Sequence, residues 1–234
     1  TIKNDIRFKY IMMIKDRVFV IGNGESRRDF NLSLLRKNGV LYGCNALYRD
    51  FNPDILVSND DGMIYEIVNS GYPEKHKCIF LNADEENNIH TEDAYYTFIP
   101  YLQDYEKYKI IETKKEGSSF FLLGNAGLKR AYVIWLSENY DIDFIHFDKK
   151  YYDWNSGTLS IKIACERHKP KEVVCIGFDS YAKQSMNHIY PEFYQLKPPA
   201  VEQWNEQHEL IQNEFPDITF LYEGRDVNFH DLIQ

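Results

Sequence analysis

Short apolar runs alternate with amphipathic stretches along most of the chain, and this alternation limits the fold more than any other feature. Most of the runs are rich in Val, Ile and Phe, and several lack the polar alternation of a half-exposed strand. Such runs are typical of strands that helices cover on both faces. We therefore predict an α/β fold with a doubly wound, mostly parallel sheet. The predicted strands are 18–21, 40–43, 55–58, 78–81, 144–147, 173–176 and 218–221.

The amphipathic stretches between these runs predict the helices, and one segment fits neither pattern. We treat the whole chain, 1–234, as one domain, because no repeat or Gly/Ser-rich linker divides it. Residues 82–119 are dense in Asn, Glu, Tyr and Asp without a clear period, so we expect a lid or small subdomain there. The predicted helices are 27–37, 62–69, 126–138, 157–168 and 201–214.

Composition and charge exclude several classes of partner. A formal net charge of −9 argues against a nucleic-acid partner, which requires clustered Lys and Arg. No run reaches the roughly 18 apolar residues of a membrane span, and the first residues are too charged for a secretory signal. We expect a cytoplasmic protein. The 18 Tyr and 15 Phe would suit a self-associating surface, so a homo-oligomer stays open.

The four cysteines, Cys44, Cys78, Cys165 and Cys175, lie within or beside apolar runs. They show no C-x-x-C spacing, which argues against a zinc site or a disulfide framework. We expect reduced thiols in the core.

The stretch RVFVIGNGES, residues 17–26, runs from a predicted buried strand into a glycine-bearing turn. Gly22 and Gly24 permit a close backbone approach, and Ser26 can cap a following helix whose free N–H groups attract an anion. The stretch lacks the third glycine of a dinucleotide fingerprint and the Lys of a P-loop. Taken alone, it fits a structural turn and a phosphate site equally well.

Polar residues also follow other predicted strands, and ligands of open α/β sheets bind outside the carboxyl ends of the strands. Any one of them fits an ordinary loop residue that satisfies local backbone groups. Together at one sheet edge, they favour a nucleotide pocket. The residues are Asn45, Ser58, Asn59, Asp60, Asp61, Gly177, Asp179 and Tyr181, with Asn155, Ser156 and Gly157 at the start of a helix.

In four stretches and in their order, the chain resembles the bacterial sialyltransferases. The stretches are VFVIGNGES, GCNALY, ILVSND and NSGTLSIKIACERHKPKEVVCIGFDSY. Those enzymes use CMP-sialic acid on a Rossmann-like variant of the nucleotide-sugar transferase fold. The resemblance covers most of the chain, apart from the middle segment. It implies a cytidine monophosphate site that includes the glycine turn with Gly22, Gly24 and Ser26. The other implied binding residues are Asn23, Asn45, Asn59, Ser156, Gly157, Gly177, Asp179 and Tyr181.

The chain departs from that family at the catalytic base. The family carries a His shortly before its C-terminal helix, and the equivalent stretch here, QLKPPAVEQW, has none. His188 lies in a loop near the supposed site and is our best choice for the base, with His208 as the fallback. Family Tyr residues assist the departing phosphate, and Tyr190 occupies roughly that place.

The predicted function is therefore a nucleotide-sugar-dependent glycosyltransferase, sialyltransferase-like, with a CMP-type donor and a hydroxyl acceptor. The mechanism would be inverting displacement at the anomeric carbon, with no metal and no other cofactor. Two alternatives stay open. The G-x-G-x-S turn at 22–26, the Cys-Asn strand end at 44–45 and the G-x-D strand end at 177–179 also resemble the archaeal 6-hydroxymethylpterin diphosphokinases. Those enzymes transfer diphosphate from ATP with a magnesium ion, which Asp60 and Asp61 could hold here. The missing family His leaves room for a descendant that binds nucleotide or sugar without catalysis.

Overall fold

The computed structural model describes residues 16–81, 118–125, 130–145, 148–151, 153–182, 188–190 and 198–234. Its main sheet has seven strands in the order β7-β4-β3-β2-β1-β8-β9, and the strand pairs described in register are parallel. The predicted α/β, Rossmann-like fold class is confirmed. The sheet comprises β1 (Arg17–Ile21), β2 (Val40–Cys44), β3 (Ile55–Ser58), β4 (Lys77–Leu81), β7 (Ile142–Ile145), β8 (Glu172–Ile176) and β9 (Thr219–Tyr222).

Contacts group the chain into two compact units, whereas we predicted one domain from the sequence. The first consists of Thr1–Val57 and Asp153–Gln234, and it contains β1, β2, β8 and β9. The second is Ser58–Tyr152, with α2 (Asp61–Asn69), β4, β7 and the antiparallel pair β5 (Ser118–Asn125) and β6 (Arg130–Ser137). The single-domain boundary stays a prediction.

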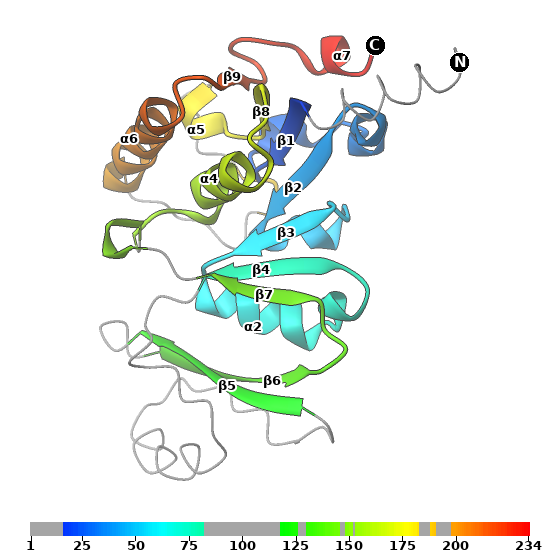
Figure 1. Cartoon of the computed structure of the whole chain (residues 1–234), viewed down its shortest axis with the longest axis vertical. Helices are drawn as coiled ribbons and strands as arrows, with labels where there is room; N and C mark the ends of the chain where they lie inside the picture. Colours follow the sequence, from blue (N-terminus) through cyan, green and yellow to red (C-terminus); the bar gives the residue numbers. More distant parts are fainter. Residues whose placement is uncertain are drawn as a thin grey trace. The chain divides into compact units, whose positions relative to one another are not determined.

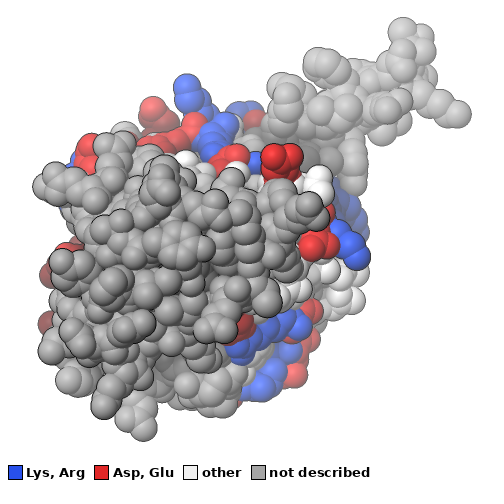
Figure 2. Space-filling model, turned by 90° about the horizontal axis from the view of Figure 1, so that it is seen from below, with Lys and Arg blue, Asp and Glu red and all other residues white. Residues whose placement is uncertain are grey.

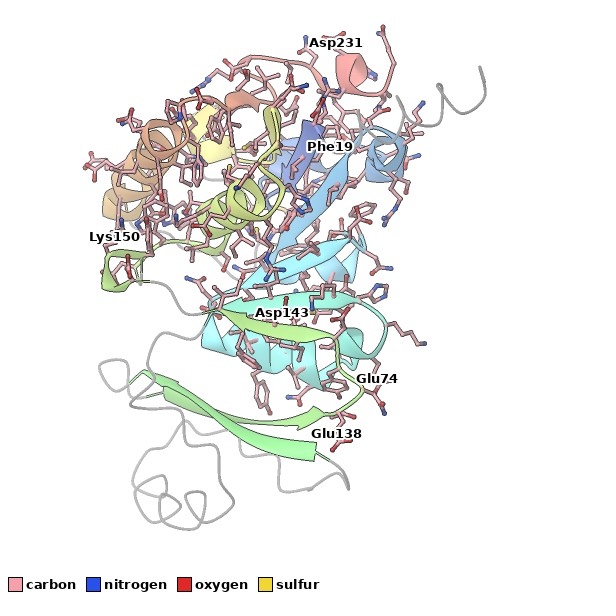
Figure 3. All side chains as sticks on the ribbon, in the orientation of Figure 1. Phe19, Glu74, Glu138, Asp143, Lys150 and Asp231 are labelled. Atoms are coloured by element: carbon pink, nitrogen blue, oxygen red, sulfur yellow. The ribbon has the colours of Figure 1, made fainter. Side chains whose placement is uncertain are left out.

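The core of the first unit forms around β1 and the helix α4 (Ser156–His168). The β1 residues Val18 to Ile21 are fully buried, and Phe19 among them is labelled in Figure 3. The first ten residues of α4 are buried as well, which explains why its sequence shows only a weak apolar face. Figure 1 shows α4 running alongside α6 (Pro198–Glu214). The predicted helices 157–168 and 201–214 are confirmed.

Two predicted helices are wrong. Residues 126–138 were expected to be helical, but Arg130–Ser137 form β6 instead, because this run pairs along its whole length with the antiparallel strand β5. Residues 27–37 form no single α-helix but two short 3₁₀ turns, Glu25–Arg27 and Leu32–Lys37. Between these turns, Phe30 stacks on Phe229 at a ring-centroid distance of 4.2 Å.

The strand β7 covers Ile142–Ile145, so it begins two residues before the predicted strand 144–147, whose last two residues lie outside the described residues. Asp143 belongs to this strand (Figure 3), and it forms an ion pair of 2.7 Å with Lys77 on β4. The ion pair stabilises Asp143 within β7, although a charged residue at this position is not predicted to belong to a strand from the sequence pattern alone. Residues 82–117 of the predicted lid lie outside the described residues, and 118–119 open β5.

The four cysteines lie in the interior, as their apolar neighbours in the sequence predict. Cys44, Cys78, Cys165 and Cys175 are all buried and free of disulfides. Burial raises the thiol pKa of Cys44 to about 12, which keeps this group protonated and unreactive at neutral pH. The prediction that the cysteines lie in the core is confirmed.

Within the described ranges, no helix is both long enough and apolar enough to cross a membrane. Basic and acidic side chains lie intermixed on the described part of the face in Figure 2. Two exposed ion pairs, Arg28–Glu25 and Arg36–Asp54, show the same mixing at short range. Exposed pairs of this kind contribute about 1 kcal/mol or less each to stability.

Candidate functional site

The order of strands reverses at β1 and β8. The chain proceeds from β1 through β2 to β3 on one side, whereas β8 and β9 lie on the other side of β1. In open α/β sheets, ligands bind in the crevice outside the carboxyl ends of the strands at such a reversal. The glycine turn follows β1, and the turn that begins at Gly177 follows β8, so both lie at this position.

These two turns contact each other through their backbones. The N–H of Gly22 donates to the Ile176 carbonyl at 2.8 Å, and the N–H of Gly24 donates to the Gly177 carbonyl at 2.9 Å. A Cβ on Gly22 would lie 2.6 Å from the Gly177 oxygen, closer than van der Waals contact permits. Gly177 itself has a φ of 72°, which favours glycine. The glycines are therefore required for packing between the strand ends.

The carboxylate of Asp179 receives the hydrogen bonds for which we predicted an external anion. The backbone N–H of Ser26 donates to Oδ2 of Asp179 at 2.9 Å, and the Ser26 hydroxyl donates to Oδ1. Asp179 is only 6% exposed. A negative group from within the chain thus satisfies the anion preference at Ser26.

We predict that Gly24→Ala lowers the free energy of unfolding by about 1–3 kcal/mol, the usual cost of overpacking. A Cβ at Gly24 would lie 2.5 Å from the carboxyl carbon of Asp179 and would push this carboxylate from Ser26. In an Asp179→Ala background the same substitution should cost clearly less, since the group it meets is gone. Urea unfolding of the four proteins measures this difference. Equal costs in both backgrounds would contradict the packing explanation.

Arg27 is the residue of the site that sequence reasoning missed. Its side chain is 1% exposed, and its Nε donates to the Gly22 carbonyl at 2.8 Å. Nη1 donates to Oδ2 of Asp50 at 2.9 Å, and Nη2 donates to Oδ1 of Asn23 at 3.1 Å. The neighbouring Arg28 is exposed. No signal in the sequence distinguishes the two, because their difference arises only from contacts with distant residues.

Residues 188–190 lie against the glycine turn. His188 forms an antiparallel bridge with Gly24, and the Ile189 N–H donates to the Asn23 carbonyl at 2.9 Å. The Asn23 side chain in turn donates from Nδ2 to the Cys44 carbonyl at the end of β2, at 2.9 Å. The structure therefore brings His188, Asn23 and the ends of β1 and β2 together.

The tautomer of His188 decides whether this residue can act as a base. Its Nδ1 lies 3.0 Å from both the carbonyl oxygen and the backbone nitrogen of Tyr190. If Nδ1 carries the proton, it donates to the carbonyl, and Nε2 has the lone pair that a general base needs. If Nδ1 accepts from the backbone N–H, Nε2 carries the proton and the neutral ring is a donor there.

The start of α4 contacts the same region through Phe178. A Cβ on Gly157 would lie 2.8 Å from a ring carbon of Phe178, which stands between Gly177 and Asp179 in the chain. Asn155 caps the helix, since its Oδ1 accepts from the Thr158 N–H at 3.0 Å. Ser156, like Gly157, is buried in this first turn.

The buried Gln207 on the neighbouring helix α6 stabilises the start of α4. Its Oε1 accepts from Nδ2 of Asn155 at 2.9 Å and from the Thr158 hydroxyl at 2.7 Å. The predicted binding residues Ser156 and Gly157 therefore belong to a helix N-terminus whose position is held by side chains from two helices.

Tyr181 belongs to an aromatic group with His208. The two rings stack at a centroid distance of 4.6 Å, and Nε2 of Gln212 donates to the Tyr181 hydroxyl at 3.2 Å. Arg225 lies over the rings of Tyr181 and Tyr222, 4.7 Å from each centroid. Tyr181 is therefore partly exposed, and contacts with His208, Gln212 and Arg225 hold its side chain.

His208 cannot serve as the fallback base. It is 1% exposed, and its Nδ1 lies 2.9 Å from the Tyr222 hydroxyl. Burial, together with the nearby Arg225 charge, lowers the His208 pKa to about 3. A neutral ring inside the core has no access to an acceptor hydroxyl.

Asn45, Asn59 and Asp60 follow two neighbouring strands. Asn45 comes directly after β2 with a φ of 49°, a left-handed conformation that Asn tolerates better than most residues. Asn59 and Asp60 belong to the second unit, where Oδ1 of Asp60 accepts from the Met63 N–H at 2.8 Å and caps α2. Among the described residues, no group of three or more His, Cys, Asp or Glu side chains is arranged to hold a metal ion.

The fold and these contacts define an α/β protein with a doubly wound parallel sheet and a polar, glycine-rich reversal point. No family model matches the sequence, and no curated protein matches it. Among solved structures, the chain is similar to the sialyltransferase CstII from Campylobacter jejuni, determined with the substrate analogue CMP-3FNeuAc. The identity is 12%, the coverage is 88% of this chain and 80% of that chain, and the TM-score is 0.43. This likeness is distant, and it carries no argument about function.

Proposed function

We propose that the chain is a nucleotide-sugar-dependent glycosyltransferase of the sialyltransferase-like type, with a CMP-type donor and a hydroxyl acceptor. One observation supports this proposal above the others. The turn after β1, the turn after β8 and the segment His188–Tyr190 are joined by hydrogen bonds at the point where the strand order reverses. Nucleotides bind at this point in folds of this class.

In this proposal, Asn45 and the start of α4 bind the nucleotide. Residues in sparsely populated backbone conformations cluster at functional sites, and Asn45 is such a residue at the carboxyl end of β2. The N-terminus of the 13-residue helix α4 would receive the phosphate, because its N–H groups and helix dipole favour negative charge. Gly22, Gly24, Gly177 and the Ser26–Asp179 pair would hold the strand ends in place.

His188 acts as the base in the proposed reaction. It takes the proton from the acceptor hydroxyl as the oxygen attacks the anomeric carbon, and the sugar–phosphate bond breaks with inversion. The electron pair of that bond leaves with the nucleotide monophosphate, whose charge is stabilised by helix N–H donors and by the Tyr181 hydroxyl. A monophosphate leaving group needs little assistance from a metal ion, because these donors can receive its charge. A cytoplasmic location and a homo-oligomer stay predictions.

A thermal-shift panel of CMP, CDP, UDP, GDP, ATP and a pterin tests the proposal. CMP should raise the melting temperature with the logarithm of its concentration, and EDTA should leave the shift unchanged, as expected for metal-independent binding to the folded state. Asn45→Ala should reduce the shift, whereas Asn213→Ala, exposed on α6, should preserve it. No shift with any compound at millimolar concentration would overturn the proposal.

Two other outcomes would identify the alternatives. A shift with ATP and magnesium alone would favour a diphosphokinase, with Asp60 and Asp61 as the first residues to substitute. A shift with CMP but no transfer or donor hydrolysis would favour a non-catalytic nucleotide-binding protein.

A further inference from the structure

The hydroxyl of Tyr190 is already engaged inside the protein. It donates to Oδ1 of Asp50, and it accepts from Nη2 of Arg27 at 3.2 Å. A Tyr hydroxyl has one proton to donate. Because the Tyr190 hydroxyl donates its proton in the hydrogen bond to Asp50, it has no second proton to donate to a leaving phosphate. Assisting that phosphate is the role that the family resemblance implies for Tyr190.

The Tyr190 ring also has contacts, with two arginine side chains. The buried Arg27 guanidinium lies 5.8 Å from the ring centroid, and the Arg49 guanidinium lies 5.5 Å from it. Burial and the hydrogen bond to Asp50 both raise the pKa of Tyr190, so this phenol stays protonated at neutral pH. The residue therefore has a fixed orientation relative to β1.

Arg27 connects this tyrosine to the glycine turn. The same guanidinium contacts the Gly22 carbonyl, the Asn23 amide oxygen and the Asp50 carboxylate. Charge-assisted bonds of this kind are about twice as strong as neutral ones, and a buried Arg leaves few alternative arrangements. Arg27 thereby links the glycine turn to the Tyr190 side chain, two residues after His188.

We propose that Arg27, Asp50 and Tyr190 form a clasp that positions His188 at the glycine turn, and that Tyr190 acts in this clasp and not on the leaving phosphate. This inference rests on the proposed function for its catalytic consequence. The three are positioning residues, because they act through His188. An acceptor hydroxyl and Nε2 of His188 must meet within hydrogen-bond reach, and a misplacement of about 1 Å can cost 100-fold in rate.

The test compares Tyr190→Phe, Asp50→Asn and the double variant in steady-state kinetics with a CMP-sugar donor. Both single variants should lower kcat about 10- to 100-fold and change the donor KM less than about twofold. The double variant should be little worse than either, because both remove the same clasp. Tyr140→Phe in the second unit and Asp29→Asn on the exposed turn are the matched controls, and both should behave as wild type.

Two results would overturn the clasp. One is a Tyr190→Phe variant that loses CMP affinity about tenfold while Asp50→Asn keeps both kcat and KM, as expected if Tyr190 held the phosphate. The other is a double variant in which the kcat losses of the two single variants multiply, as expected for independent effects. Wild-type protein that turns over no CMP-sugar would overturn the proposed function instead.

Amide hydrogen exchange tests whether the clasp holds residues 188–190 at the glycine turn, and it requires no activity assay. The Ile189 N–H, bonded to the Asn23 carbonyl, should exchange at least about tenfold faster in Tyr190→Phe and in Asp50→Asn. Unchanged exchange at Ile189 in both variants would overturn the clasp by itself.

Discussion

Replacing His188 with alanine is expected to lower turnover by roughly two to four orders of magnitude, the usual contribution of a general base. Nucleotide affinity should hardly change, because the proposed role of His188 is toward the acceptor hydroxyl and not toward the donor. The measurement is single-turnover transfer from a CMP-sugar, with CMP affinity from thermal shift. The matched control is His230→Ala, which replaces an exposed histidine within α7 (Phe229–Leu232) and should keep full activity.

A His188→Ala variant that transfers sugar as fast as wild type would place the base elsewhere. If it instead lost CMP affinity in proportion to turnover, His188 would be a donor-binding residue. The structure explains why this substitution reports on chemistry: His188 bonds to the neighbouring Tyr190 backbone, while Arg27 and Asp50 bond to the Tyr190 side chain. Removing the imidazole leaves those side-chain contacts in place.

Stability is expected to fall as the pH drops below about 6.5, with His208 as a principal cause. Burial lowers the folded-state pKa of His208 to about 3, so between these values the unfolded chain binds a proton that the folded chain does not. The free energy of unfolding then decreases with falling pH, by up to about 1.4 kcal/mol per pH unit for one such group. From pH 6.5 to pH 4, this amounts to roughly 3 kcal/mol.

Urea unfolding at pH 7.5, 6.5, 5.5 and 4.5 measures this slope. His208→Gln removes the titrating group and keeps a hydrogen-bonding side chain beside Tyr222, so its pH dependence should be shallower than that of wild type. His168, whose pKa burial also lowers, contributes in the same direction in both proteins. His230→Gln is the exposed control, and its slope should match wild type. Parallel slopes for wild type and His208→Gln would contradict the assignment.

Much of the framework was predictable because its signals are local. Continuous apolar runs identified β1 and β8, and an Asn cap followed by an apolar pattern identified α4. The prediction failed at β6, where a run suited to either structure is a strand because β5 pairs with it. Local propensity cannot report such a partner, since pairing depends on residues elsewhere in the chain.

The candidate site shows the same division. The glycines after β1 and β8 were identifiable from their position after buried strands, and the structure adds that they contact each other. The partners of the polar residues were not identifiable. Asp179 was predicted to bind a nucleotide, but its carboxylate accepts from Ser26, 153 positions away in the chain. Only the fold shows this carboxylate already engaged.

The sequence by itself determined the α/β class, the main strands and the sheet edge where polar turns gather. Periodicity and glycine placement carry that information within a few neighbouring residues. Tertiary structure alone decided which side chains are buried and which groups they bond. Arg27 is enclosed and Arg28 exposed, His188 lies at the glycine turn and His208 is inside the core. Each of these differences arises from long-range packing, because identical side chains acquire different burial, hydrogen bonds and charge from the elements that fold around them.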